Sequence, residues 1–107
     1  MNYIKQEEVC GECFKEAYYF VTKEHPDLFL VHGSVDMFDL ADRHINNHAW
    51  AENESGTRIF DPTINLEESR KKLESKNIIY NSEAKYSAEE AVINAVRFGH
   101  FGPWHTD

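Results

Sequence analysis

The sequence predicts an α+β domain: a small antiparallel β-sheet, an N-terminal helix packed against one face of it, and a C-terminal helix that completes the core. Three observations lead to this prediction. An apolar stripe at helical spacing lies near the start of the chain, two β-type segments flank a turn in the middle, and a capping-box pattern opens an apolar helix near the end. With 107 residues, 41% of them hydrophobic and 28% charged, the chain has the size and composition of one packed domain spanning residues 1–107.

The first predicted helix spans residues 11–24. Its apolar positions follow the i, i+3, i+4, i+7 spacing of one helix face. These positions are Phe14, Ala17, Tyr18 and Val21. Pro26 ends the helix, because the residue before a proline avoids the helical region. Cys13 therefore lies in the first turn.

Two strands follow, separated by a segment of mixed character. Residues 28–35 form a short apolar, β-branched run that ends in glycine and serine, which predicts a buried strand. Residues 36–43 are acidic and predict a loop with a helical turn. Residues 44–52 alternate in polarity, which predicts a second strand. One face of this strand is expected to carry His44, Asn46, His48, Trp50 and Glu52.

A hairpin is predicted to join the strand at residues 44–52 to a returning strand that starts at Thr57, because the Asn-Glu-Ser-Gly sequence between them has turn chemistry. Asp61 follows the returning strand. If Glu52 pairs with Thr57, His48 lies opposite Asp61. The hairpin therefore predicts a contact between the histidine and the carboxylate.

The second half of the chain predicts two more helices. Residues 66–76 begin with acidic and end with basic side chains, which suits the dipole of a surface helix. Ser87 and the glutamate three residues later form a capping box, which opens an apolar helix that stops at Gly99. The tail beyond it is expected to be irregular, either held by packing of the aromatic residues Phe101 and Trp104 or frayed.

The formal net charge of −8 surrounds the chain with a negative potential that repels nucleic acid and anionic lipid, so neither is an expected partner. The first eight residues contain a lysine but no following apolar run, and no stretch of about 18 apolar residues occurs. These features predict a cytoplasmic protein that does not bind membranes.

Three residues have the chemistry of a thiol-based active site. A thiol attacks an acyl carbon only as the thiolate, which a helix N-terminus and a nearby imidazolium favour. Cys13 has the helix position, His48 is the best candidate for its base, and Asp61 would accept a hydrogen bond from the second ring nitrogen. The backbone N–H of Cys13 is the natural oxyanion donor, and Gln6 is the first candidate for a side-chain donor.

Three motifs in this order resemble the transglutaminase-like superfamily: Gly-x-Cys ending at Cys13, His-Ala-Trp-x-Glu at residues 48–52, and Asp-Pro-Thr at residues 61–63. The sequence around Cys13 is also similar to the papain-like cysteine-protease motif. The resemblance covers about half of the chain, from residue 11 to residue 63. It implies acyl-transfer or amide-hydrolysing chemistry through a thioester, on a protein or peptide substrate and without a cofactor. Hydrolysis by a peptidase or deamidase is expected before amine transfer.

Several alternatives stay open at this point. Trp50 would either wall the substrate cleft or belong to the core. Cys10 is either a spectator or the partner of Cys13 in a reversible disulfide that switches the site off. The same C-x-x-C pair resembles a redox motif, although the polar residues before it do not predict the strand that such a motif needs.

Two alternatives would make the protein an interaction domain. The first is a zinc site formed by Cys10, Cys13, His44 and His48, for which a strand would hold the two histidines too far apart to share one ion. The second is a catalytically silent module with an inert Cys13, which recruits a protein through the cleft or through the aromatic tail at residues 98–104.

Overall fold

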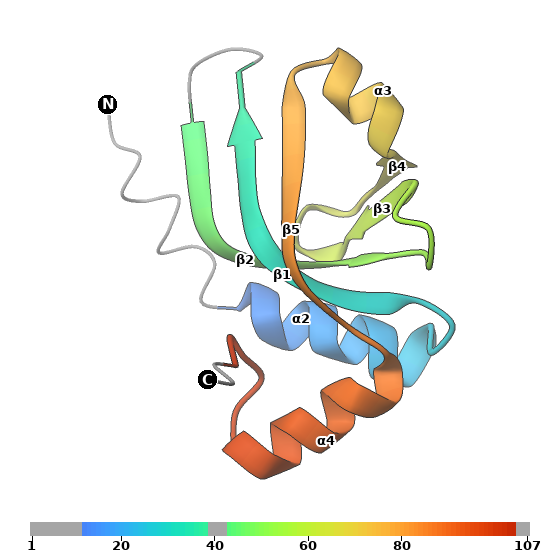
Figure 1. The fold of residues 1–107 in the computed structure, drawn as a ribbon, viewed down its shortest axis with the longest axis vertical. Coiled ribbons are helices and arrows are strands. Elements are labelled where there is room, and N and C mark those ends of the chain that lie inside the picture. The colour runs from blue at the N-terminus through green and yellow to red at the C-terminus, as the bar shows by residue number, and fades with distance from the viewer. Residues whose placement is uncertain (1–11, 39–42, 105–107) are drawn as a thin grey trace.

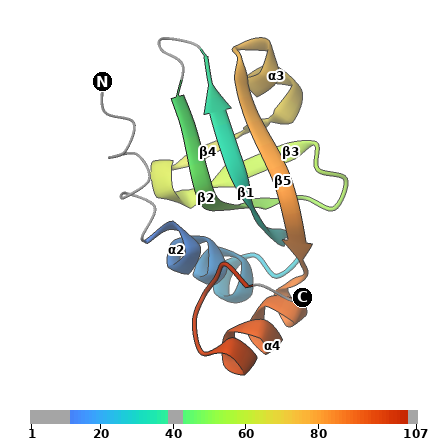
Figure 2. The ribbon, with the colours of Figure 1, turned by 60° about the vertical axis from the view of Figure 1, so that its left-hand side comes forward.

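The computed structural model describes residues 12–38 and 43–104, and it confirms the α+β class. Its five strands form one antiparallel sheet in the order β4-β3-β2-β1-β5. In Figure 1, α2 and α4 lie next to each other below the strands, whereas α3 lies at the upper end of the sheet beside β5. The turned view in Figure 2 shows the same arrangement. The helix with Cys13 therefore covers one part of the sheet while α3 covers another.

The predicted N-terminal helix is present. It consists of the α-helix α2 (Cys13–Tyr19), which continues into the π-helical turn η1 (Phe20–Glu24). The apolar stripe that predicted it is buried throughout. Its members are Phe14, Ala17, Tyr18 and Val21. Burial of this stripe holds α2 against β2 and fixes the position of Cys13 at the start of the helix.

The centre of the sheet is β1 (Phe29–Met37), which pairs with β2 (Arg43–Glu52) on one side and β5 (Ile78–Tyr86) on the other. The strands predicted at residues 28–35 and 44–52 are thus confirmed. The prediction for residues 36–43 is wrong where the structure describes them in strands, at residues 36, 37 and 43, because the hydrogen-bonded ladder with β2 and β5 continues there. Residues 39–42 lie outside the described part of the chain.

No element is predicted above for residues 77–86, yet they form β5, a full-length partner of the central strand. Its first residues are β-branched and aromatic, a composition typical of strands, but the polar residues after Tyr80 dilute the pattern. A bulge at Glu83, between the pairs His32–Ala84 and Gly33–Ser82, bends the strand. Gly33 permits the close approach here, because a Cβ on it would lie 1.9 Å from the carbonyl oxygen of Asn81.

A second bulge, in β2, decides which histidine faces the interior. Asn46 and Asn47 together oppose the single residue Ser34 of β1, and Asn47 has a φ of 53°, a left-handed conformation that asparagine tolerates. The extra residue reverses the alternation, so His44 is exposed whereas His48 is buried. The predicted single polar face of β2 is therefore wrong at His44 and Asn46.

The hairpin between β2 and β3 (Arg58–Asp61) is present, but its register differs from the predicted one. Glu52 pairs with Ile59 instead of Thr57, a shift of two residues. Because side chains alternate with a period of two, this shift leaves Asp61 on the predicted face of the sheet. The histidine and the carboxylate can still meet.

The predicted helix at residues 66–76 is wrong in its first four residues. After the short helical turn η2 (Pro62–Ile64), the strand β4 (Leu66–Ser69) pairs with β3 at the edge of the sheet. The helix α3 (Arg70–Ser75) starts only after Ser69, whose side chain caps it by accepting a hydrogen bond from the backbone N–H of Lys72. Pairing with the exposed edge of β3 outweighed the helical preference of this polar segment.

The C-terminal helix α4 (Ala88–Phe98) has the predicted capping box at Ser87 and ends at Gly99, which has a φ of 77°. It buries Ala91 fully and packs its neighbours Ala88, Ala95 and Phe98 against the core. The tail up to Trp104 is irregular and held by aromatic packing. Among the described residues, no helix has the length and apolar character needed to cross a bilayer.

His32 on β1 is enclosed by this aromatic packing. Its ring centroid lies 4.8 Å from that of Phe14, 5.2 Å from that of Tyr86 and 5.1 Å from that of Trp104. Within the described ranges, its Nε2 atom has no hydrogen-bond partner. Burial lowers the pKa of His32 from its ordinary value of 6.5 to about 4, because a charged imidazolium would lose its hydration there.

Stability should therefore fall in mild acid. Above pH 6.5 His32 is neutral in the folded and the unfolded chain and adds no pH dependence. As the pH falls from 6.5 to about 4, the unfolded chain binds a proton that the folded protein does not, so folding loses up to about 3 kcal/mol. Replacing His32 with leucine should remove this component, as measured by urea unfolding at pH 7 and pH 4.5. Equal losses in the two proteins would contradict it.

Candidate active site

Cys13 is the first residue of α2 and is fully buried. Its Sγ atom lies 3.9 Å from the carbonyl oxygen of Asn47, within the range of a weak S–H···O hydrogen bond. Asn47 is the bulge residue that directly precedes His48. The start of α2 is thus held against the part of β2 that carries the histidine.

His48 and Asp61 form a buried pair. The distance from His48 Nε2 to Asp61 Oδ2 is 2.7 Å, and the two residues are 5% and 1% exposed. The contact expected from the hairpin is therefore present despite the shifted register. With Nε2 oriented by the carboxylate, the tautomer and the orientation of the ring are set by a neighbour that water cannot easily displace.

Tyr80 also binds Asp61, although no pattern in the sequence predicts this contact. Its hydroxyl donates a hydrogen bond of 2.8 Å to the same Oδ2 atom of Asp61. Burial, and next the negative charge of Asp61, raise the pKa of Tyr80 well above its ordinary value of 10.0, so the hydroxyl stays protonated and remains a donor. Only the pairing of β5 with β1 brings Tyr80 here, and that pairing has no local signal in the sequence.

Trp50 is a core residue. It is fully buried, its ring stacks at 5.8 Å from that of His48, and it meets the ring of Tyr80 edge-on at 4.9 Å. The indole N–H donates to Glu52 Oε2 at 2.8 Å. Of the two alternatives for Trp50, the structure therefore favours the core, where its ring packs against those of His48 and Tyr80.

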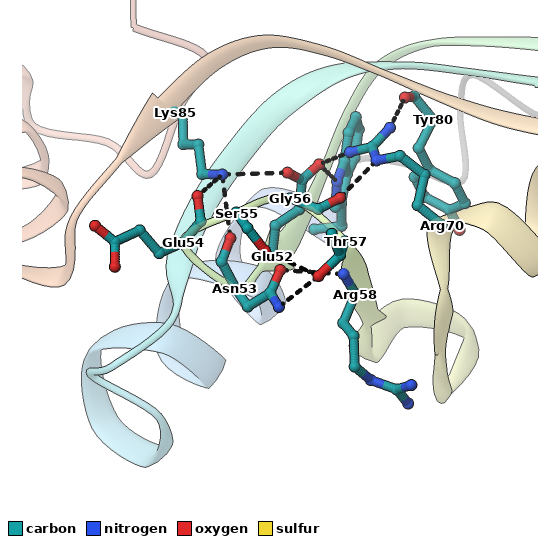
Figure 3. A network of polar contacts seen from close by, with 11 residues as sticks. Glu52, Asn53, Glu54, Ser55, Gly56, Thr57, Arg58, Arg70, Tyr80 and Lys85 are labelled. Carbon is teal, nitrogen blue, oxygen red and sulfur yellow. Dashed lines mark hydrogen bonds and ion pairs between the residues drawn. The ribbon is translucent and has the colours of Figure 1, made fainter.

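Glu52, the last residue of the His-Ala-Trp-x-Glu motif, is the centre of a polar network. Figure 3 shows Arg70 and Lys85 reaching its buried carboxylate from opposite sides. Arg70 also donates to the carbonyl oxygens of Gly56, at 2.7 Å, and Tyr80, at 2.6 Å. Lys85 binds the carbonyl oxygens at the start of the hairpin turn. The network ties the β2–β3 hairpin to α3 and β5, which holds the strands that carry His48 and Asp61.

Three other residues singled out in the sequence remain, namely Gln6, Cys10 and His44. Gln6 and Cys10 lie outside the described residues. His44 pairs with Asp36 on the exposed side of β2, where the hydrogen bond from His44 lowers the pKa of Asp36. The zinc alternative requires His44 and His48 on one face, and the bulge separates them. Over residues 12–38 and 43–104, no group of three or more His, Cys, Asp and Glu side chains could hold a metal ion.

No protein-family model, no curated protein and no solved structure matches the chain. The interpretation of the site therefore rests on its own geometry.

The Tyr80 hydroxyl is expected to stabilise the protein by satisfying Asp61. In Tyr80→Phe the ring contacts with Trp50 remain, but the buried carboxylate loses a donor, which costs about 1–3 kcal/mol. The free energy of urea unfolding measures this loss. The partly exposed Tyr19 offers a matched control, and Tyr19→Phe should change stability by less than about 0.5 kcal/mol. Equal effects of the two substitutions would show that the hydroxyl of Tyr80 has no special role.

Proposed function

We propose that the protein is a cysteine-dependent acyl-transfer enzyme in which Cys13 is the nucleophile, His48 is its general base and Asp61 orients the histidine. The observation that carries the proposal is the buried contact of 2.7 Å between His48 Nε2 and Asp61 Oδ2. Cys13, at the start of a helix, contacts the carbonyl oxygen of the residue before His48. A buried imidazole that is oriented through Nε2 by a carboxylate can exchange a proton with a thiol through Nδ1.

The reaction would be hydrolysis of an amide or ester in a protein or peptide. The Cys13 thiolate attacks the carbonyl carbon, a C–S bond forms, and the oxygen takes the negative charge. The protonated His48 then gives its proton to the leaving nitrogen or oxygen as that bond breaks, which leaves a thioester. A water molecule gives a proton to His48 and attacks the thioester. The C–S bond breaks, releasing the acid and restoring the thiolate–imidazolium pair.

The backbone N–H of Cys13 would stabilise the oxyanion, because the first amides of a helix have no acceptor within the helix. Hydrolysis is preferred to amine transfer in this proposal, as the resemblance to the cysteine-protease motif suggests. Amine transfer would use the same thioester with an amine in place of water.

The burial of Cys13 favours a second candidate function, a catalytically silent binding module on the same fold. With 0% of the cysteine exposed, an acyl group reaches the sulfur only after the atoms that cover it move. The tail at residues 98–104 is a poor docking segment for such a module, because Trp104 is buried against His32 and Tyr86. A silent module would bind its partner without using the thiol.

Alkylation kinetics separate the two functions. We expect iodoacetamide to label Cys13 in a Cys10→Ser background with a rate that rises through a midpoint well below pH 8.5, the region for an ordinary thiol. His48→Ala should move the midpoint back toward 8.5. The measurement is the second-order rate constant at each pH, with the labelled residue identified by mass spectrometry.

The matched control is His44→Ala, which removes an exposed histidine from the same strand and should leave the midpoint unchanged. A midpoint near 8.5 in all three proteins, or no labelling at any pH, would contradict the enzyme and support the silent module.

A further inference from the structure

A cavity of about 360 Å³ adjoins His48. Its lining comes from β1, β2 and β5 on one side and from η2, β4 and α3 on the other. The volume lies near the lower end of the range of ligand pockets, roughly 300 to 1,000 Å³, which suits one large side chain with its adjoining backbone.

The walls of the cavity are mainly aliphatic. They are formed by Ile45, Ile64, Leu66, Leu73 and Ile78. Of the described residues, those that line the cavity include no carboxylate, and Arg43 is the one with a permanent charge. An apolar group entering the cavity would lose its contact with water without separating any ion pair inside it, so its transfer is favourable.

Two polar atoms of lining residues lack a hydrogen-bond partner among the described residues. The hydroxyl oxygen of Thr63 and the Nε atom of Arg43 are both buried and unbonded. Both atoms can donate a hydrogen bond, and a buried donor without an acceptor costs about 1–3 kcal/mol. The acceptor that a bound peptide offers beside an apolar side chain is a backbone carbonyl oxygen.

We propose that this cavity is the subsite for a leucine-like aliphatic side chain of the peptide on which the enzyme acts, with Thr63 and Arg43 binding the adjoining backbone carbonyl. The proposal rests on the proposed function, since His48 is the residue shared by the cavity and the reaction. It assigns the substrate class as peptides with an aliphatic residue at the acyl side of the scissile bond, in preference to those with a charged or small one.

Chloromethyl ketones test the subsite. The Cys13 thiolate displaces chloride from the chloromethyl carbon, so a C–S bond forms and a C–Cl bond breaks. We expect N-acetyl-leucine chloromethyl ketone to label Cys13 at least about tenfold faster than the glycine reagent, which is the rate ratio that a buried leucine side chain supplies. Dividing each rate by that of iodoacetamide removes differences in the thiol itself.

A substitution that fills the cavity provides a protein for comparison with the unmodified one. Ile64 is 54% exposed at the rim, so Ile64→Trp should fold while its larger ring occupies the cavity. We expect the leucine-to-glycine ratio, with each rate divided by that of iodoacetamide, to fall to near one. Val96→Trp, on the exposed side of α4, is the matched control and should leave the ratio unchanged. A ratio near one in the unmodified protein, or an unchanged ratio in Ile64→Trp, would overturn the subsite.

Binding of an amino-acid amide to Cys13→Ala tests the subsite without the thiol, and therefore independently of the proposed function. In Cys13→Ala, N-acetyl-leucinamide should shift the methyl resonances of Ile45, Leu73 and Ile78, whereas N-acetyl-glycinamide should not. The shifts should disappear in the Ile64→Trp background. An ordinary thiol in the alkylation experiment together with these shifts would reject the enzyme and keep the cavity as a peptide-binding site, whereas absence of the shifts would overturn the subsite.

Discussion

The buried contact between His48 and Asp61 is the constraint on which the rest of the site depends. A carboxylate that is 1% exposed is destabilising unless donors replace its lost hydration. His48 and Tyr80 supply two donors to one oxygen, and they come from different strands. Both donors therefore reach Asp61 only when β2, β3 and β5 are all in place. The geometry of the site forms together with the sheet.

The bulge at Asn46 and Asn47 links this contact to the start of α2. By adding one residue to β2 it turns His48 inward and presents the Asn47 carbonyl to Cys13. A regular strand would have put His44 and His48 on one face and would have left the carbonyl in the ladder with β1. The bulge thus links the start of α2, through the Asn47 carbonyl, to the residue that directly precedes His48.

The sequence predicted the parts of this site that are encoded locally. The stripe around Phe14, the alternation near Trp50 and the capping box at Ser87 each specify an element through its own residues. A two-residue error in the hairpin register did not move Asp61 off its face, because faces depend only on the parity of the shift.

What could not be predicted depends on contacts between distant segments. Tyr80 reaches Asp61 only because β5 pairs with β1, and the strand at Leu66 exists only because β3 offers an open edge. The bulge in β2 had one local signal, two consecutive asparagines, but alternation alone does not reveal an inserted residue. Burial of Trp50 likewise depends on a distant segment, because its ring packs edge-on against that of Tyr80 on β5.

The protonation state of His48 is the most direct test of whether Cys13 and His48 form a catalytic pair. In an activated site the Cys13 thiolate and the His48 imidazolium stabilise each other, so removing the thiol should change the titration of the ring. The ¹⁵N chemical shifts of His48, recorded from pH 4 to 9, report the protonation of both nitrogens. The account predicts a doubly protonated ring at pH 7 in the unmodified protein and a neutral ring at pH 7 in Cys13→Ala. A ring that is neutral at pH 7 in both proteins and titrates identically would show that the cysteine and the histidine are neighbours without forming a catalytic pair.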